Sequence, residues 1–168
     1  MIRTIIVFFF IFCFSYADGN YHAVKGGILS HSNGFISSGR ESGYDVNVEL
    51  QFKEKLLLGH YTTGADINTN NDTSFLYGGL SWEGRFFDNL LIGAFLGAAI
   101  HNGELDDGSS DKRQLGSRVT FRESLDIGFY LKKNISVSLM WDHYSNLGIR
   151  GASNQGNDNI GIRIGYYF

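Results

Sequence analysis

The stretch RVTFRESLDIGFYL, residues 118–131, decides the fold because apolar and polar side chains alternate along nearly all of it. A repeat of two residues is typical of a β-strand with one apolar and one polar face. The apolar face would carry Val119, Phe121, Leu125, Ile127, Phe129 and Leu131, and the other face Arg118, Thr120, Arg122, Ser124, Asp126 and Gly128. Glu123 is a charged residue within the apolar series.

The same alternation recurs along the chain and predicts eight strands. Their bounds are 21–30, 44–53, 55–63, 74–86, 90–101, 117–131, 135–146 and 158–168. The long polar connections are Ser30–Gly43, Gly64–Thr73, Asn102–Gly116 and Leu147–Asn157, and the short ones lie around Glu54, Phe87–Asn89 and Lys132–Asn134. Short turns at one end and long loops at the other predict an all-β fold, an eight-stranded antiparallel up-and-down transmembrane β-barrel.

The composition fits this prediction and excludes several other classes of protein. The 168 residues include 22 Gly, 14 Phe and 9 Tyr but no Pro, which suits long strands paired on both sides. A charged fraction of 18% with 15% aromatic residues is not that of a disordered chain. A net charge of -3 provides no basic surface for nucleic acid.

The pattern of residues 1–17 is typical of a secretory signal peptide. Arg3 precedes an apolar run over residues 5–14, and small residues stand at Ser15 and Ala17, before a predicted cleavage at Asp18. The run is shorter than the ~20 residues that a spanning helix needs. We therefore expect a barrel over residues 18–168 that contains no cysteine, because Cys13 would be removed.

The alternative fold is a soluble exported β-sandwich or a lipocalin-like barrel, which would bury its apolar face. The polar faces of the predicted strands, however, carry charges of both signs. These are Glu49, Glu83, Arg85, Arg118, Arg122, Asp126 and Arg163. An eight-stranded barrel is just wide enough for side chains to fill it, so these charges can pair inside while the apolar face meets lipid. A filled interior also argues against a general porin.

Three residues with catalytic chemistry fall on the predicted lipid-facing surface. His143 and Ser145 continue the outward series of the strand over residues 135–146, and Asp158 begins the outward series of the last strand. The two strands are antiparallel neighbours, so a hydroxyl, an imidazole and a carboxylate would share one hairpin. This is the nucleophile, base and orienting acid of acyl transfer. A spanning strand takes ~9–11 residues, which places Asp158 near the outer rim, beside the lipopolysaccharide leaflet.

Two alternatives stay open at this point. Glu123 would lie opposite His143 if the turn centres on Lys133, and it competes with Asp158 as the acid. A His and a Ser near a strand end also occur as interfacial polar residues without a catalytic role. His101 falls on the inward face of its strand and is predicted to be a packed, hydrogen-bonded interior residue.

The C-terminal half resembles the outer-membrane lipid A 3-O-deacylases of the PagL type. The resemblance rests on His143-Tyr144-Ser145-Asn146 followed by the run NQGND at 154–158, and extends to His101-Asn102-Gly103, the run 115–128 and the terminal Phe168. It implies an eight-stranded membrane barrel with its site on the outer surface and no metal or other cofactor. Asp158 stands where the family often has Glu, and Leu147 where a small residue is common.

Carried over residue by residue, the resemblance implies Ser145 as nucleophile, His143 as base and Asp158 as acid, with Asn146 and the backbone N–H of Gly148 as the oxyanion hole. It implies removal of the 3-position acyl chain of lipid A, with lipopolysaccharide and outer-membrane lipid as partners in a Gram-negative outer membrane. A homodimer is left open. The alternative function is a structural or adhesive small barrel whose long loops bind a partner. The acidic run Glu104-Leu105-Asp106-Asp107 with Asp111 is expected to be a solvated loop rather than a cation site.

Overall fold

The computed structural model describes residues 21–37, 39–105, 112–148 and 154–168. The predicted signal peptide, residues 1–17, lies outside the described residues, as do Asp106, Asp107 and Asp111 of the acidic run. Within the described part of the chain, no helix is long and apolar enough to cross a membrane.

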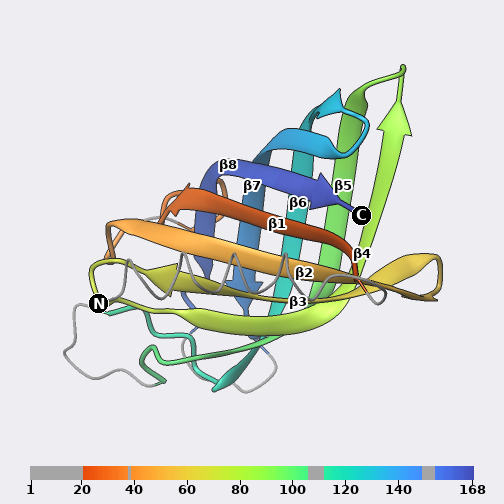
Figure 1. Ribbon diagram of the computed structural model, residues 1–168. Coiled ribbons are helices and arrows are strands. Elements are labelled where there is room, and N and C mark those ends of the chain that lie inside the picture. Colours follow the sequence, from red (N-terminus) through yellow and green to blue (C-terminus); the bar gives the residue numbers. More distant parts are fainter. Residues whose placement is uncertain (1–20, 38, 106–111, 149–153) are drawn as a thin grey trace, which may run out of the picture.

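Eight antiparallel strands form a closed barrel, as predicted (Figure 1). They are β1 (Tyr21–Ser30), β2 (Tyr44–Leu56), β3 (Gly59–Asn68), β4 (Phe75–Phe86), β5 (Leu90–His101), β6 (Val119–Lys132), β7 (Ile135–Ser145) and β8 (Asn157–Tyr167). Each strand pairs with its neighbour in the chain, and β1 pairs with β8 from Ala23 opposite Tyr167 to Ser30 opposite Ile160. Each of the eight described strands is therefore paired with a neighbour on both sides.

The connections differ in length between the two ends of the barrel, which we call the loop end and the turn end. Residues 31–43, 69–74, 102–118 and 146–156 connect strands at the loop end, and residues 57–58, 87–89 and 133–134 at the turn end (Figure 1). Tyr21 pairs with Phe52 of β2 and so lies at the turn end, together with Phe168.

The turn between β2 and β3 differs from the sequence prediction. It was expected around Glu54 but consists of Leu57 and Leu58, with φ of 50° and 66°. Two residues of positive φ make the hairpin turn that matches strand twist, although neither is the usual Asn or Gly, so the apolar run concealed it. β3 consequently begins at Gly59 and continues past Gly64, which had been expected to begin a long loop.

The division of each strand into an outward apolar face and an inward polar face agrees with the prediction at most positions. Phe121 and Ile127 of β6 are 43% and 56% exposed on the outer surface, whereas Arg122 and Asp126 are buried inside. Arg85 and Arg118 are exceptions, because both are exposed at the barrel rims. Arg85 lies over the Tyr130 ring at the turn end, and Arg118 donates to the carbonyls of His101 and Gly103 at the loop end.

Paired charges and aromatic rings fill the interior. Arg163 forms ion pairs with Asp126 at 2.5 Å and Glu49 at 2.9 Å, and Arg122 pairs with Asp142 at 3.2 Å. An apolar layer closes the interior toward the loop end and consists of Phe75, Tyr77, Phe95, Ala99, Leu115 and Tyr144. Removing one partner of such a buried pair typically costs about 3–5 kcal/mol, so these contacts fix the barrel that carries the outer surface.

Candidate active site

The three predicted catalytic residues lie on the outer surface of β7 and β8, at the loop end, and two of them, His143 and Asp158, are in contact. Trp141, His143 and Ser145 alternate along the outward face of β7, and Asp158 of β8 is the register partner of His143. His143 and Ser145 are 7% exposed, and Asp158 is fully buried. Apolar side chains occupy the outward positions farther from the loop end, so the polar group marks one end of the lipid-facing surface.

His143 contacts the acid but not the hydroxyl. Its Nδ1 lies 2.5 Å from Asp158 Oδ1. An ionised carboxylate only accepts hydrogen bonds, so Nδ1 carries the proton and Nε2 of the neutral ring keeps a lone pair. Among the described residues, no hydrogen bond joins Nε2 to Ser145 Oγ. Catalytic hydrogen bonds are often long in the absence of substrate. Ser145, two positions after His143 on the same strand face, therefore stays the predicted nucleophile.

Asp158 accepts hydrogen bonds from four donors. Its Oδ1 accepts from His143 and from Ser37 Oγ, the latter at 2.7 Å. Its Oδ2 accepts from the backbone N–H of Ile36 at 2.8 Å and from Trp141 Nε1 at 2.9 Å. A carboxylate offers about four lone-pair positions, so this set satisfies it.

Glu123 occupies the other side of His143. The register of β6 and β7 places it directly opposite the histidine, as the position of the turn predicted. It is exposed, and no described residue forms a hydrogen bond or ion pair with its carboxylate. The two acids therefore flank one imidazole, and the carboxylate of Asp158 is the one that contacts it.

The predicted oxyanion-hole donors lie in the turn after β7 and are engaged within the protein. The Asn146 N–H donates to Asn154 Oδ1 at 3.1 Å, and the Gly148 N–H donates to Asn146 Oδ1 at 2.8 Å. The Asn146 side chain also donates to the carbonyl of Leu115 at 2.9 Å. An oxyanion at this turn would have to displace the acceptor from one of these backbone N–H groups. The assignment of Asn146 and Gly148 to the oxyanion hole therefore stays a prediction.

A family comparison covers the strands that carry Ser145, His143 and Asp158. The model of the lipid A 3-O-deacylase (PagL) family matches residues 41–167. The chain belongs to the lipid A 3-O-deacylase family. No curated protein sequence matches the chain.

Solved structures show that PagL and other membrane barrels share this fold. The crystal structure of the outer-membrane enzyme PagL superposes with a TM-score of 0.62 at 17% identity, covering 87% of this chain and 99% of PagL. Neisserial surface protein A follows with a TM-score of 0.57 at 9% identity, covering 90% and 100% of the two chains. A de novo designed transmembrane barrel reaches 0.55 at 11% identity, covering 89% and 98%. The chain is thus a barrel of the outer-membrane type, and neither its structure nor these likenesses support a homodimer.

The sequence pattern did not predict the contribution of the first long connection to this candidate site. The donors Ser37 Oγ and Ile36 N–H come from a connection without periodic pattern, 121 and 122 residues before Asp158. No local signal marks such a contact. Trp141 could have been noticed, because it stands two positions before His143 on the same strand face.

A buried charge cluster anchors the same connection. His31 lies between two carboxylates, with Nδ1 2.8 Å from Asp45 and Nε2 2.9 Å from Glu41. Burial alone would lower the pKa of His31, but the hydrogen bonds to Asp45 and Glu41 raise it to about 9. Burial alone would raise the pKa of Glu41, but hydrogen bonds from His31, Thr73 and the Arg113 N–H lower it.

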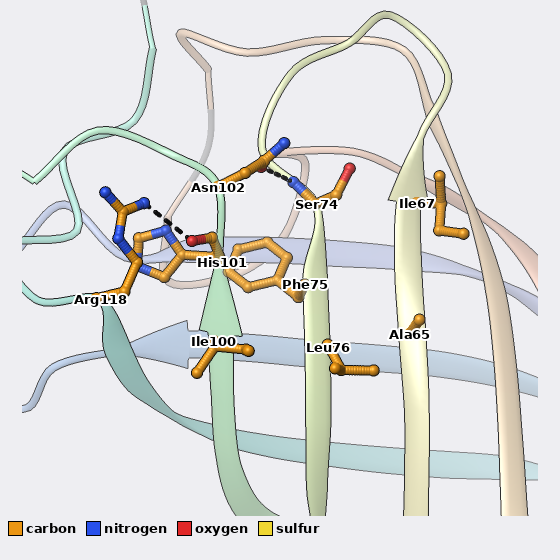
Figure 2. A pocket seen from close by; sticks show the side chains of 9 residues that line it. All are labelled: Ala65, Ile67, Ser74, Phe75, Leu76, Ile100, His101, Asn102 and Arg118. Atoms are coloured by element: carbon orange, nitrogen blue, oxygen red, sulfur yellow. Dashed lines mark hydrogen bonds between the residues drawn. The ribbon is translucent and has the colours of Figure 1, made fainter.

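A groove of about 420 Å³ lies on the outer surface of β3–β5 at the loop end (Figure 2). Ser74, Asn102 and Arg118 line its rim, with Ala65, Leu76 and Ile100 below them. His101 lies behind it with both ring nitrogens occupied, Nε2 by the Ser117 carbonyl at 2.7 Å and Nδ1 by the Gly103 N–H at 3.1 Å. Within the described residues, no group of three or more His, Cys, Asp or Glu side chains is placed to hold a metal ion.

Proposed function

We propose that this protein hydrolyses the 3-position acyl ester of lipid A, with Ser145 as nucleophile, His143 as base and Asp158 as the acid that orients the base. The observation that carries the proposal is the hydrogen bond from His143 to Asp158, formed on the same outward face that carries Ser145. Membership of the deacylase family supports the substrate class.

The reaction would proceed through an acyl-enzyme. Ser145 Oγ attacks the ester carbonyl while His143 Nε2 takes the hydroxyl proton, and Asp158 stabilises the imidazolium that forms. Collapse of the tetrahedral intermediate breaks the bond to the sugar oxygen, which leaves as the 3-hydroxyl with the proton from His143. Water then attacks the acyl-enzyme with His143 again as base, which releases the fatty acid and restores Ser145.

The negative charge of the tetrahedral intermediate needs donors, and removing one such donor typically lowers the rate by about 10²–10³-fold. The candidate donors are the N–H groups of Asn146 and Gly148 in the turn that follows Ser145, where each donates to an asparagine side chain. We propose that substrate binding exchanges one of their internal hydrogen bonds for the oxyanion. Asn146 would then serve through its backbone, because its side chain already holds the turn.

The position of the site suits an ester that lies within the membrane. The outward apolar side chains of β6–β8 border it on the side away from the loop end, and the long connections would face the cell exterior as in other outer-membrane barrels. The outer leaflet there is mainly lipopolysaccharide, whose lipid A would reach Ser145 sideways from the leaflet.

Mass spectrometry of lipid A tests this proposal. A Gram-negative host whose lipid A carries a 3-linked hydroxyacyl chain would express the wild type, Ser145→Ala or the control Ser117→Ala, which lies at the same end of the barrel. We expect loss of one acyl mass with the wild type and the control but not with Ser145→Ala. Unaltered lipid A in cells with a folded, inserted wild-type barrel would contradict the proposal and favour a structural or adhesive barrel.

A further inference from the structure

The first long connection and the outward tryptophan of β7 form a clamp around the acid of the site. We propose that Ser37 and Trp141 are positioning residues, which hold the Asp158 carboxylate in the orientation that aligns His143. The inference rests on the proposed function, and it adds two side chains and one loop to the machinery. Ser37 precedes the 41–167 segment that matches the family model, so that match does not cover its contribution.

The clamp divides its donors evenly between the two carboxylate oxygens. Ser37 shares Oδ1 with His143, while Trp141 and the Ile36 N–H share Oδ2. An oxygen that accepts from fixed donors on both sides cannot rotate away from the imidazole without breaking hydrogen bonds. A carboxylate next to lipid is also costly unless it is fully hydrogen-bonded, so the clamp keeps the acid ionised and aligned.

Hydrogen bonds to β8 and to Arg113 hold the loop in a fixed position against Asp158. The Asn33 N–H donates to the Asp158 carbonyl at 2.8 Å, which extends the pairing of the chain beyond β1. Ser32 donates from its backbone to Asn159 Oδ1, and its Oγ accepts from both Nε and Nη2 of Arg113 at 2.9 and 2.8 Å. A side chain at Gly34 would meet the Asp158 Cβ at 2.2 Å, so glycine is required for this close approach.

Trp141 also connects the loop to the histidine. Its ring centroid lies 6.2 Å from that of His143, at an interplanar angle of 17°, and 6.2 Å from that of Phe35. The sequence contains one other tryptophan, Trp82, which donates its indole N–H to the Leu57 carbonyl at the turn end. Trp82 therefore provides a matched control, because both indoles donate a hydrogen bond but only one donates to the acid.

Kinetics of purified, folded protein on lipopolysaccharide would test the clamp. We expect Trp141→Phe and Ser37→Ala each to lower kcat by roughly ten- to a hundredfold, the range for a lost hydrogen bond to a charged group. KM should change less than kcat, because neither side chain binds the ester in this proposal. Ser37→Thr should restore most of the rate, since it keeps the hydroxyl. Ser42 lies in the same connection as Ser37, but its Oγ accepts from Asn70 Nδ2 and does not contact Asp158. Trp82→Phe and Ser42→Ala should therefore retain wild-type rates.

A double-mutant cycle separates positioning from general damage. In an Asp158→Ala background the clamp has no carboxylate to hold, so Trp141→Phe should lower the rate little further. An equal fold-loss in both backgrounds, or full activity of both Trp141→Phe and Ser37→Ala, would overturn the inference. The exchange protection of the Ile36 N–H should fall in Asp158→Ala, and unaltered protection would also overturn it. Hydrogen exchange can be measured on an inactive protein, so it tests the clamp independently of catalysis. Absence of deacylation by the wild type would contradict the proposed function itself.

Discussion

Two patches of the outer surface lie at the loop end, and they differ in what covers them. On β7–β8 the connection over residues 31–37 folds against the barrel and supplies donors to a buried acid. On β3–β5 the surface is an open, mainly apolar groove with polar side chains only at its rim. Asp158, the buried acid of the outward surface, thus has a polar cover that comes from a loop, whereas the neighbouring Glu123 is exposed and has none among the described residues.

The same contrast holds for the two histidines that belong to these patches. His101 points inward and uses both ring nitrogens in hydrogen bonds to backbone groups. His143 points outward, uses Nδ1 for Asp158, and has an Nε2 to which no described residue is hydrogen-bonded. A general base needs an available lone pair, so of these two histidines we propose only His143 as the base.

The largest effect would come from exchanging the reactive residues of the first patch. Ser145→Ala and His143→Ala should each lower deacylation by a factor on the order of 10⁴ to 10⁶, and the double change should be little worse, because the residues act as one unit. His101→Gln should lower it by less than about tenfold, since neutral hydrogen bonds are worth about 1 kcal/mol. Rates on purified lipopolysaccharide measure the difference. Equal losses at His101 and His143 would remove the distinction between the patches.

The second effect in size concerns the two acids beside His143. Asp158→Asn should lower the rate by a factor on the order of 10⁴, as for an orienting acid, whereas Glu123→Gln should have a small effect because its carboxylate does not contact the ring. Asp158→Glu should keep measurable activity, reduced by the tight contact with Gly34. Steady-state kinetics would decide it, and a greater loss in Glu123→Gln would assign the acid to the other strand.

The third prediction concerns the loop that covers only the first patch. His31, with its pKa raised to about 9, stabilises the loop fully below its ordinary value of 6.5 and loses this contribution as pH rises through about 9. Glu41, with a lowered pKa, contributes above its ordinary value of 4.5 and loses its contribution as pH falls through the lowered value. Protection of the loop should therefore be greatest between about pH 4.5 and 6.5.

Hydrogen-exchange protection factors of the loop, corrected for the intrinsic pH dependence of exchange, would measure this. We expect a loss of roughly tenfold or more as pH rises through the pKa of His31, because one pKa unit corresponds to about 1.4 kcal/mol. His31→Gln should be less protected at low pH and insensitive to the alkaline change. A parallel alkaline loss in both proteins would show that another group is responsible.

The smallest effect is expected from the second patch. Ala65→Leu, which fills the groove, and Arg118→Ala, which removes the charge from its rim, should leave deacylation within about twofold, because surface changes away from a site rarely exceed ±0.5 kcal/mol. The rates of both variants on lipopolysaccharide provide the check. A large loss in either variant would mean that the groove takes part in the reaction.

The sequence predicted the parts of this molecule that depend on local pattern. The alternation around Phe121 and Asp126 was enough to assign both faces of β6, and counting along β7 and β8 was enough to bring His143 beside Asp158. The pattern did not show where strands leave the barrel, which is why Arg118 was expected inside. It also could not show that Ser37 binds Asp158, because a loop without periodicity carries no trace of a partner so distant in the chain.

The outward position of Ser145 has a kinetic consequence for an enzyme of the proposed type. A site entered from the side of a filled barrel receives substrate by lateral diffusion in two dimensions. Its rate should then follow the mole fraction of lipid A in the membrane or micelle rather than the bulk concentration of lipopolysaccharide. Both products are amphiphiles that remain in the same layer. We therefore expect the released fatty acid to compete with lipid A for the outward surface around Ser145.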